Sequence, residues 1–377
     1  MDDQILKNTL NQILSRNRIE LSPEERAFLL TATNHPTALK LLAGDAFNRG
    51  SSKDAVYFAT KAYQSFPNAE TEENLISCLV QAKQVKAAID LCSKSSTKLG
   101  AMRQASLLSE LFARSGSLEQ SKIWGLKALG LKDKAAGTLD KLPPVKLHTF
   151  NSATPARNVI SFSLFGSNPK YAQGALRNAM IARHLYPDWT TRFYVDDSIS
   201  PQITKALGRE GAQLRRVGGL PADRFGTFWR FLVEDDPEVD FYIVRDCDSI
   251  LNIKERAAVD QWLSSKKPFH LMRDGPSQSE LVLAGMWGAH RGNIGKMTNR
   301  VIAFDKTVAS LRNSRILDQQ FLREVVWPIM RGRVCVHDSI FGYGKTHEFD
   351  PAFSLERGTH IGDDMTGPLS AGARAQG

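Results

Sequence analysis

The sequence of 377 residues is 42% hydrophobic and 24% charged, a composition typical of globular proteins, and its length favours two domains over one. Its net charge of +9 is spread along the chain without a basic stripe carrying interleaved aromatic residues, so nucleic-acid binding is not expected. No run approaches the ~18 apolar residues of a membrane helix, and the acidic start MDDQILKN does not resemble a secretory signal, so we expect no transmembrane segment and a cytoplasmic protein.

Residues 1–135 carry helical patterns throughout and contain a repeat. The segments SSKDAVYFATKA, QVKAAIDLCSKS and SLEQSKIWGLKA align at a spacing of 33 residues on the small residues Ala55, Ala88 and Ser121. This spacing is close to the ~34-residue period of tetratricopeptide (TPR) helix pairs. We therefore predict an all-α, TPR-like repeat domain, with an irregular helical bundle as the alternative. No catalytic constellation lies in this part.

A break in the helical pattern follows at residues 136–150. Gly137 and the pair Pro143-Pro144 interrupt the periodicity, which predicts a linker between two domains.

From residue 151 the sequence pattern changes and predicts strands that alternate with helices. The segment NVISFSLFG predicts a strand over 158–166, and YAQGALRNAMIARHLYP predicts a helix over 171–187. Further alternating segments lead to the apolar strand FYIV at 241–244. This order predicts an α/β domain over residues 151–364 with a doubly wound, mostly parallel sheet, in which ligands bind beyond the carboxyl ends of the strands. The small, polar residues 365–377 predict a disordered tail.

Asp246 and Asp248 come directly after this strand, in FYIVRDCDSI. Residues two apart in extended chain project to the same side, so both carboxylates can converge on one point in front of the sheet. A hard divalent cation, Mn²⁺ or Mg²⁺, is the natural partner of two adjacent carboxylates. The alternative is a pair of turn or capping aspartates.

The four cysteines add no further metal site. Cys78, Cys92, Cys247 and Cys335 form no C-x-x-C pair, which suits a reducing compartment and argues against structural zinc.

The stretch FYIVRDCDSI resembles the D-x-D strand of GT-A-type glycosyltransferases, which use nucleotide sugars as donors. The ordered segments FSLFGSNPKYAQGALRN, RDCDSILNIKERAAVDQWL, FHLMRD, AGMWG, DQQFL and HDS are similar to a sparsely characterised group of bacterial glycosyltransferases. The resemblance spans residues 158–363 and leaves out the helical part. It implies a GT-A-like fold in which the D-x-D motif holds a divalent metal against the donor diphosphate.

The resemblance also implies residues that bind the donor. The first strand and its loop would take the nucleotide base through Ser163, Phe165 and Gly166, with Tyr171 as a stacking or core residue. Arg230 matches the basic residue that faces the diphosphate, or forms a surface ion pair with Glu234.

Two later segments of the same motif set are expected near the sugar. Arg273 and Asp274 either bind sugar hydroxyls or brace a loop. Gly285 and Trp287 either form a platform under a sugar ring or, for the tryptophan, belong to the core.

The catalytic residues implied are Asp318 and Gln319, the D-Q pair that faces the transferred sugar in this family, although Asp318 could equally cap a helix. The third metal ligand would be His337, in the HDS motif, or alternatively His360. A buried structural histidine is the other reading of either residue.

These residues together predict a metal-dependent transferase that moves a sugar from a nucleotide-sugar donor to a glycan or another hydroxyl acceptor. The repeats would recruit a protein partner or the acceptor. One alternative is a non-catalytic scaffold that binds a nucleotide sugar or a glycan. Another is a nucleotidyltransferase, although SFSLFGSNPK is a poor match for its phosphate loop.

Overall fold

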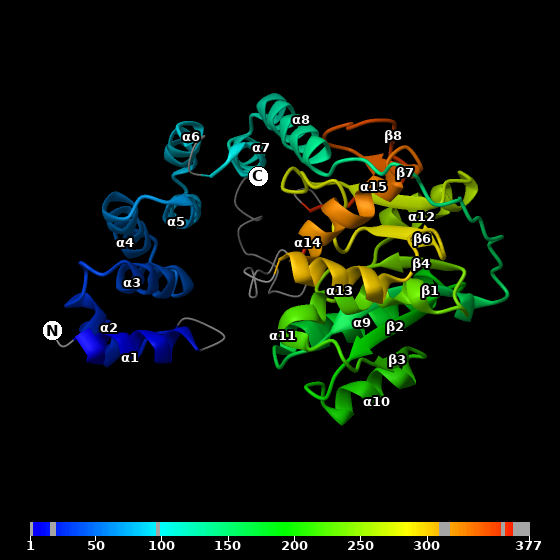
Figure 1. Cartoon of the computed structure of the whole chain (residues 1–377), viewed down its shortest axis with the longest axis horizontal. Coiled ribbons are helices and arrows are strands. Elements are labelled where there is room, and N and C mark those ends of the chain that lie inside the picture. Colours follow the sequence, from blue (N-terminus) through cyan, green and yellow to red (C-terminus); the bar gives the residue numbers. More distant parts are fainter. Residues whose placement is uncertain (1–2, 16–19, 96–98, 309–316, 356–358, 365–377) are drawn as a thin grey trace. The chain divides into compact units, whose positions relative to one another are not determined.

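A computed structural model describes residues 3–15, 20–95, 99–308, 317–355 and 359–364 (Figure 1). The chain divides into two compact units, Met1–Ala128 and Leu129–Gly377, and each is described by itself. The predicted disordered tail, 365–377, lies outside the described residues. None of the described helices is both long enough and apolar enough to cross a membrane.

The first unit is helical, as the sequence predicts. Its helices are α1 (Asp3–Leu14), α2 (Pro23–Leu30), α3 (Pro36–Asn48), α4 (Ser52–Ser65), α5 (Ala69–Gln81), α6 (Val85–Ser93), α7 (Ala101–Arg114) and the first part of α8 (Leu118–Ala135). The three small residues of the repeat lie in the first turns of α4, α6 and α8, and all three are buried. The 33-residue spacing therefore matches a structural repeat of helix starts. The TPR assignment itself stays a prediction.

The boundary between the units differs from the predicted linker. The second unit begins inside α8, and the segment 136–150 is bound along it by hydrogen bonds. The Asn293 side chain accepts from the Lys146 N–H at 2.9 Å and donates to the Lys146 carbonyl at 2.8 Å, while Arg333 donates to the Pro143 carbonyl at 2.6 Å. α8 ends at Ala135, just before Gly137 with its left-handed φ of +70°, and the extended chain that follows finds hydrogen-bond partners elsewhere in the second unit.

The second unit contains an eight-stranded, mostly parallel sheet in the order β3-β2-β1-β4-β6-β5-β7-β8. The strands are β1 (Asn158–Leu164), β2 (Thr190–Val195), β3 (Gln213–Arg216), β4 (Phe241–Val244), β5 (Phe269–Arg273), β6 (Trp287–His290), β7 (Val334–Asp338) and β8 (Thr346–His347). Only β6 runs antiparallel, to both β4 and β5. The predicted α/β class is confirmed.

Helices connect and cover the strands. They are η1 (Pro155–Arg157), α9 (Pro169–Leu185), α10 (Pro201–Arg209), α11 (Ala222–Phe225), η2 (Gly226–Asp235), α12 (Ile253–Ser264), α13 (Met297–Thr307), α14 (Leu317–Phe321), η4 (Leu322–Val326) and α15 (Trp327–Met330).

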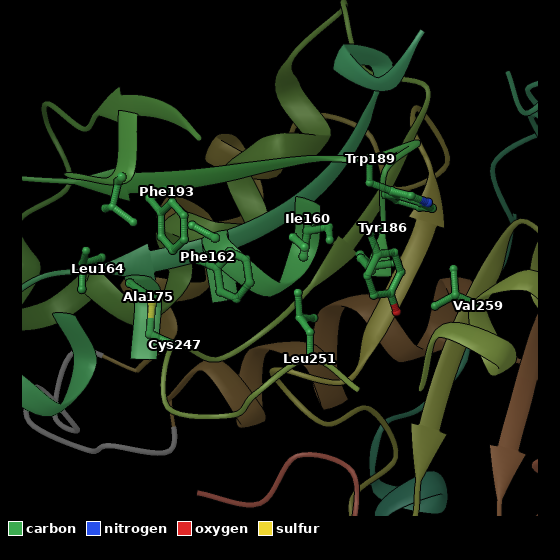
Figure 2. Packing of buried hydrophobic residues seen from close by; sticks show 14 of the residues in the cluster. Ile160, Phe162, Leu164, Ala175, Tyr186, Trp189, Phe193, Cys247, Leu251 and Val259 are labelled. Carbon is green, nitrogen blue, oxygen red and sulfur yellow. The ribbon is translucent and has the colours of Figure 1, made fainter. Parts of the chain in front are cut away.

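The main core of this unit follows from the alternation of side chains along β1. Ile160, Phe162 and Leu164 point to one face and pack with residues of α9 and α12, as Figure 2 shows. Phe162 stacks on Phe193 of the neighbouring strand, with ring centroids 4.8 Å apart. The opposite face of β1 carries Ser161, so this strand presents a hydroxyl to the elements on that side.

Glu234, at the end of η2, gives the fold a pH dependence. Its carboxylate accepts from the N–H groups of Gly292 and Ile294, and burial raises its pKa to about 7. The contribution of Glu234 to the free energy of unfolding is therefore fully present below its usual pKa near 4.5. It falls as the pH rises toward 7, because in this range Glu234 ionises only in the unfolded chain. The loss amounts to about 3 kcal/mol.

We expect Glu234→Gln to remove this loss, since the amide oxygen still accepts both N–H groups. The measurement is the free energy of unfolding by denaturant at pH 5 and pH 8 for both proteins. An unchanged difference between the two pH values in the variant would contradict the assignment.

Candidate active site

A cavity of about 510 Å³ opens at the carboxyl end of β4, the edge where the sequence places a ligand site. It is lined by Thr227, Arg230, Asp246, Ser277, Gln278, Leu283, Ala284, Gly285, Met286, Asp318, Gln319, His360, Gly362 and Asp363. Residues from five separate segments of the chain meet here. Five residues proposed from the sequence, together with the alternative ligand His360, are among them.

Arg230 is the centre of this cavity wall. Its guanidinium donates to Asp246 through Nη1 and to Asp318 through Nη2, the latter at 2.9 Å. Arg230 and Asp318 are both buried, whereas the Asp246 side chain is 43% exposed and faces the cavity. The Nε of Arg230 has no partner among the described residues, so one donor of the guanidinium is left over. The surface ion pair with Glu234 considered from the sequence is not formed.

Two serines on β1 fix the position of Arg230. The Ser161 hydroxyl donates to the Arg230 carbonyl at 2.6 Å, and the Ser163 hydroxyl accepts from the Arg230 N–H at 2.9 Å. Because these backbone groups bond to β1, they do not join an α-helical ladder, and η2 is a 3₁₀ segment here. Ser163 therefore positions the arginine.

Phe165, like Ser163, holds η2 in place. Its ring packs edge-on against Trp229, with centroids 5.4 Å apart, and lies against Gly226, where a side chain would collide with it. Neither Ser163 nor Phe165 lines this cavity; both support η2, and their base-binding role stays a prediction.

Asp318 and Gln319 enter the cavity from α14 in different roles. Burial, with the nearby Asp246 charge, raises the pKa of Asp318 against the opposing effect of Arg230, so it is a stronger base than an exposed aspartate. The Gln319 side chain accepts from the Ala284 N–H at 2.6 Å and donates to the Val282 carbonyl at 3.0 Å. Both ends of this amide hold backbone, so its predicted catalytic role is corrected to a positioning role.

Gly285 allows the cavity wall to approach the D-x-D motif. A Cβ at this position would overlap the Asp246 carboxylate. The glycine predicted as a sugar platform is thus needed for the close contact between this loop and Asp246.

The segment 359–364 closes one side of the cavity. His360 contacts Asp363 through Nε2 at 2.9 Å, and the Ile361 backbone is held by Gln278 and by Asp274. Asp274 also pairs with Lys254 at 2.7 Å and accepts from Ser339. Asp274 therefore braces this segment, the second of its two expected roles.

Asp248 does not share a partner with Asp246. Its carboxylate pairs with Lys170, 2.8 Å away at the start of α9, and the same ammonium lies 2.6 Å from Asp364. The turn that carries Asp248 is fixed to α9 by Asn178, which donates to the Ser249 carbonyl and accepts from the Leu251 N–H. Each aspartate of the D-x-D motif is thus neutralised by its own cation.

His337 does not reach the D-x-D motif. It is fully buried in β7, with Nδ1 2.9 Å from His270 Nε2 and Nε2 2.8 Å from Gln261. Burial lowers the pKa of His337 to about 4, which keeps the ring neutral. Since both ring nitrogens are occupied, the prediction of a metal ligand at His337 is wrong. The alternative from the sequence, His360, lies in the cavity wall.

Three other predicted donor residues belong to the interior or to the neighbouring surface. Arg273 is buried and donates to Asp338 and to the carbonyls of the 280–281 loop, so it braces that loop. Trp287 is fully buried in β6, edge-on to Tyr242, so the sugar-platform expectation is corrected to a core residue. Tyr171 is 38% exposed, with the Lys170 ammonium 5.2 Å from its ring centroid.

Gly166 follows β1 in the left-handed region with φ of +78°, and its N–H donates to Ser198 at 2.7 Å. β1 ends at Leu164, two residues before the end of the predicted strand, and Gly166 makes the turn that follows.

The carboxylates of Asp246 and Asp248 are ligands that suit a divalent cation, but the described residues do not form a protein site with three ligands. Within the described ranges, no group of three or more His, Cys, Asp or Glu side chains could hold a metal ion as they stand. Magnesium commonly takes only one or two protein carboxylates and receives its other ligands from phosphate and water. Asp246 and Asp248 are two carboxylates of this kind, each paired with its own cation in this structure.

The sequence interpretation missed four residues of this site. Lys170, Asn178, Gln278 and Asp363 were not singled out, although Lys170 directly precedes Tyr171 in a quoted motif and Asp363 lies three residues after His360. Their roles depend on contacts between segments up to 194 residues apart in sequence, as with Lys170 and Asp364.

No protein-family model matches the chain, and no curated protein matches its sequence. One similar solved structure is an O-GlcNAc transferase mutant from Thermobaculum terrenum, with 18% sequence identity and a TM-score of 0.45. The match covers 65% of this chain and 46% of that one, so the chain spans about half the length of this relative. A similarity of this degree carries no argument about function.

We expect Gly285→Ala to lower the free energy of unfolding by about 1–3 kcal/mol, because the new methyl group displaces the Asp246 carboxylate from Arg230. The matched control is Gly208→Ala in α10, where a Cβ meets no atom within 4 Å. That helical substitution should be neutral or stabilising by up to about 1 kcal/mol. Denaturant unfolding measures both, and equal stability of the two variants would contradict the packing argument.

Proposed function

We propose that the second unit is a glycosyltransferase of the GT-A type, which moves a sugar from a nucleoside-diphosphate sugar to a hydroxyl acceptor. The observation that carries this proposal is the cavity at the end of β4, where one buried arginine joins Asp246 to Asp318. The resemblance of the sequence to D-x-D enzymes supports the same reading. The cavity is also within the size range of ~300–1,000 Å³ of small-molecule sites.

Arg230 would stabilise the leaving group in this reaction. Cleavage of the bond between the sugar and the diphosphate leaves an additional negative charge on the phosphate oxygen. A guanidinium held in place by Ser161 and Ser163 needs no rearrangement to meet that charge, which is the condition for efficient electrostatic stabilisation.

Asp318 would act on the acceptor. Its carboxylate lies in the cavity wall, and its raised pKa makes it a better proton acceptor than an exposed aspartate. In this role it accepts the proton of the acceptor hydroxyl as the new glycosidic bond forms.

Asp246 and Asp248 would hold a divalent cation, Mn²⁺ or Mg²⁺, together with the diphosphate. When bound, such an ion neutralises charge on the phosphate oxygens. His360, the second histidine candidate of the sequence, is proposed as an additional ligand because it borders the same cavity as Asp246 and, unlike the fully buried His337, is part-exposed; its Nε2 would exchange Asp363 for the metal. The helical first unit is proposed to bind a protein partner or the acceptor.

The first test is binding of candidate donors. We expect a nucleoside-diphosphate sugar of one base series to raise the melting temperature in the presence of Mn²⁺, because ligands that bind only the folded state stabilise it. The double variant Asp246→Asn, Asp248→Asn should lose this shift, whereas Asp140→Asn, at an exposed site outside the cavity, should keep it.

A thermal-shift screen of nucleoside diphosphates and their sugars, with and without Mn²⁺, provides the measurement. Stabilisation that persists in the double variant would remove the D-x-D motif from the proposal. Stabilisation without any sugar transfer or donor hydrolysis would favour the non-catalytic scaffold.

The two histidines give a second test. We expect His360→Ala to weaken the Mn²⁺ dependence of donor binding by about tenfold, a typical loss for a metal site deprived of a supporting group. His337→Ala should lower stability, since it leaves His270 and Gln261 without their buried partner, but should leave that Mn²⁺ dependence unchanged. Titration of Mn²⁺ at a fixed donor concentration measures both, and the reverse order of effects would restore His337 as the ligand.

A further inference from the structure

Acidic side chains gather around the D-x-D motif. Five carboxylates lie on or beside the cavity, those of Asp246, Asp248, Asp318, Asp363 and Asp364. Among the described residues, Arg230 and Lys170 are cations that contact members of this group. A diphosphate would add more negative charge here, so positive charge close to the motif favours its binding.

The two cations differ in how firmly they are held. Arg230 is buried and is fixed at its backbone by two serines, so it is a permanent part of the wall. The Lys170 side chain is flexible and more open to water: it is 30% exposed, against 6% for Arg230, and its partners Asp248 and Asp364 are 24% and 51% exposed. Ion pairs that water reaches are weak and exchange easily.

The Lys170 ammonium also occupies a particular position. It lies within 2.8 Å of Asp248 and 2.6 Å of Asp364, so it contacts the second aspartate of the D-x-D motif and the closing segment 359–364 at once. A backbone bridge between Ser249 and Asp364 joins the same two segments. A cation that binds the Asp248 carboxylate must therefore share it with this ammonium or displace it.

We propose that Lys170 is the internal counter-ion of the D-x-D motif. Without a donor it neutralises Asp248 and fastens the segment 359–364 through Asp364. When a divalent cation arrives with a diphosphate, Lys170 gives up Asp248 to the metal, and its ammonium pairs with the diphosphate instead. Lys170 is thus a positioning residue that makes metal binding depend on the donor. This inference rests on the proposed function.

Removal of the Lys170 ammonium should change the binding of Mn²⁺ and of a nucleoside diphosphate in opposite directions. Removal of the ammonium takes a positive charge away from the metal position, so Mn²⁺ alone should bind more tightly. It also takes away a partner of the diphosphate, so a nucleoside diphosphate should bind more weakly. A residue with only a structural role would not strengthen any ligand when it is removed.

The test uses the full chain and Mn²⁺ alone, with free Mn²⁺ followed by electron paramagnetic resonance. We expect Lys170→Met to lower the Kd for Mn²⁺ by at least about tenfold, as expected for the loss of a like charge at close range. Lys170→Arg, which keeps the charge, should stay near the wild-type value. The double variant Lys170→Met, Asp248→Asn should lose the gain, because the gain acts through Asp248.

Asp364→Asn is the matched control, since it cuts the other arm of the bridge and leaves Lys170 on Asp248. Its Kd for Mn²⁺ should change less than that of Lys170→Met. Unfolding curves establish that each variant is folded.

A Lys170→Met protein that is folded and binds Mn²⁺ no more tightly than the wild type would overturn the inference, as would the absence of Mn²⁺ binding in both proteins. Because no nucleotide is present, either result concerns Lys170 alone. The proposed function is judged separately by the donor screen, where a stabilising donor could still be found.

Discussion

The ion-paired contact of Arg230 with Asp246 and Asp318 is the interaction on which the site depends. A guanidinium presents its donors in a fixed plane, so it holds two carboxylates in a more defined geometry than a flexible ammonium does. The pair with Asp318 is buried, and loss of either partner would leave an uncompensated charge away from water. The surrounding structure therefore supports this one side chain from several directions.

That support begins in the sheet. β1 lies beside β4, so the serines of β1 and the carboxyl end of β4 are near each other. Ser161 and Ser163 alternate with the apolar residues that face the main core, and they bond the backbone of Arg230 on the opposite face. The same strand thus builds the hydrophobic core on one side and positions the charged residue on the other.

The rest of the cavity is held by side chains that bond to backbone. Gln319 fixes the 282–284 stretch, and Gln278 and Asp274 fix Ile361. These residues need not touch a ligand to matter, because they set the distance between loops that have no regular structure of their own. The two cations beside the D-x-D motif are held differently, because the Arg230 side chain is buried whereas that of Lys170 is 30% exposed.

Several site residues were predictable from local pattern, and others were not. The apolar run of β4 and the two aspartates after it placed Asp246 at the carboxyl end of a strand, and the family resemblance pointed to Arg230. The short strand β6 was missed, because WGAH lacks an alternating pattern and its strand is buried on both faces between β4 and β5. Trp287 was for that reason read as a possible platform.

The sequence could not show which groups the site side chains contact, and the physical reason is a different one. A histidine, an arginine or an aspartate can bond to a ligand or to another side chain, and only the packing of distant segments decides which. His337 meets His270 because β7 pairs with β5, and Asp248 meets Lys170 because α9 lies beside the D-x-D turn. The sequence by itself determined the helical first part, the alternating α/β second part and the strand that carries two aspartates, since these follow from local periodicity. The tertiary structure alone decided which charges face one another, because hydrogen bonds and ion pairs form between groups brought together by folding and leave no local pattern in the chain.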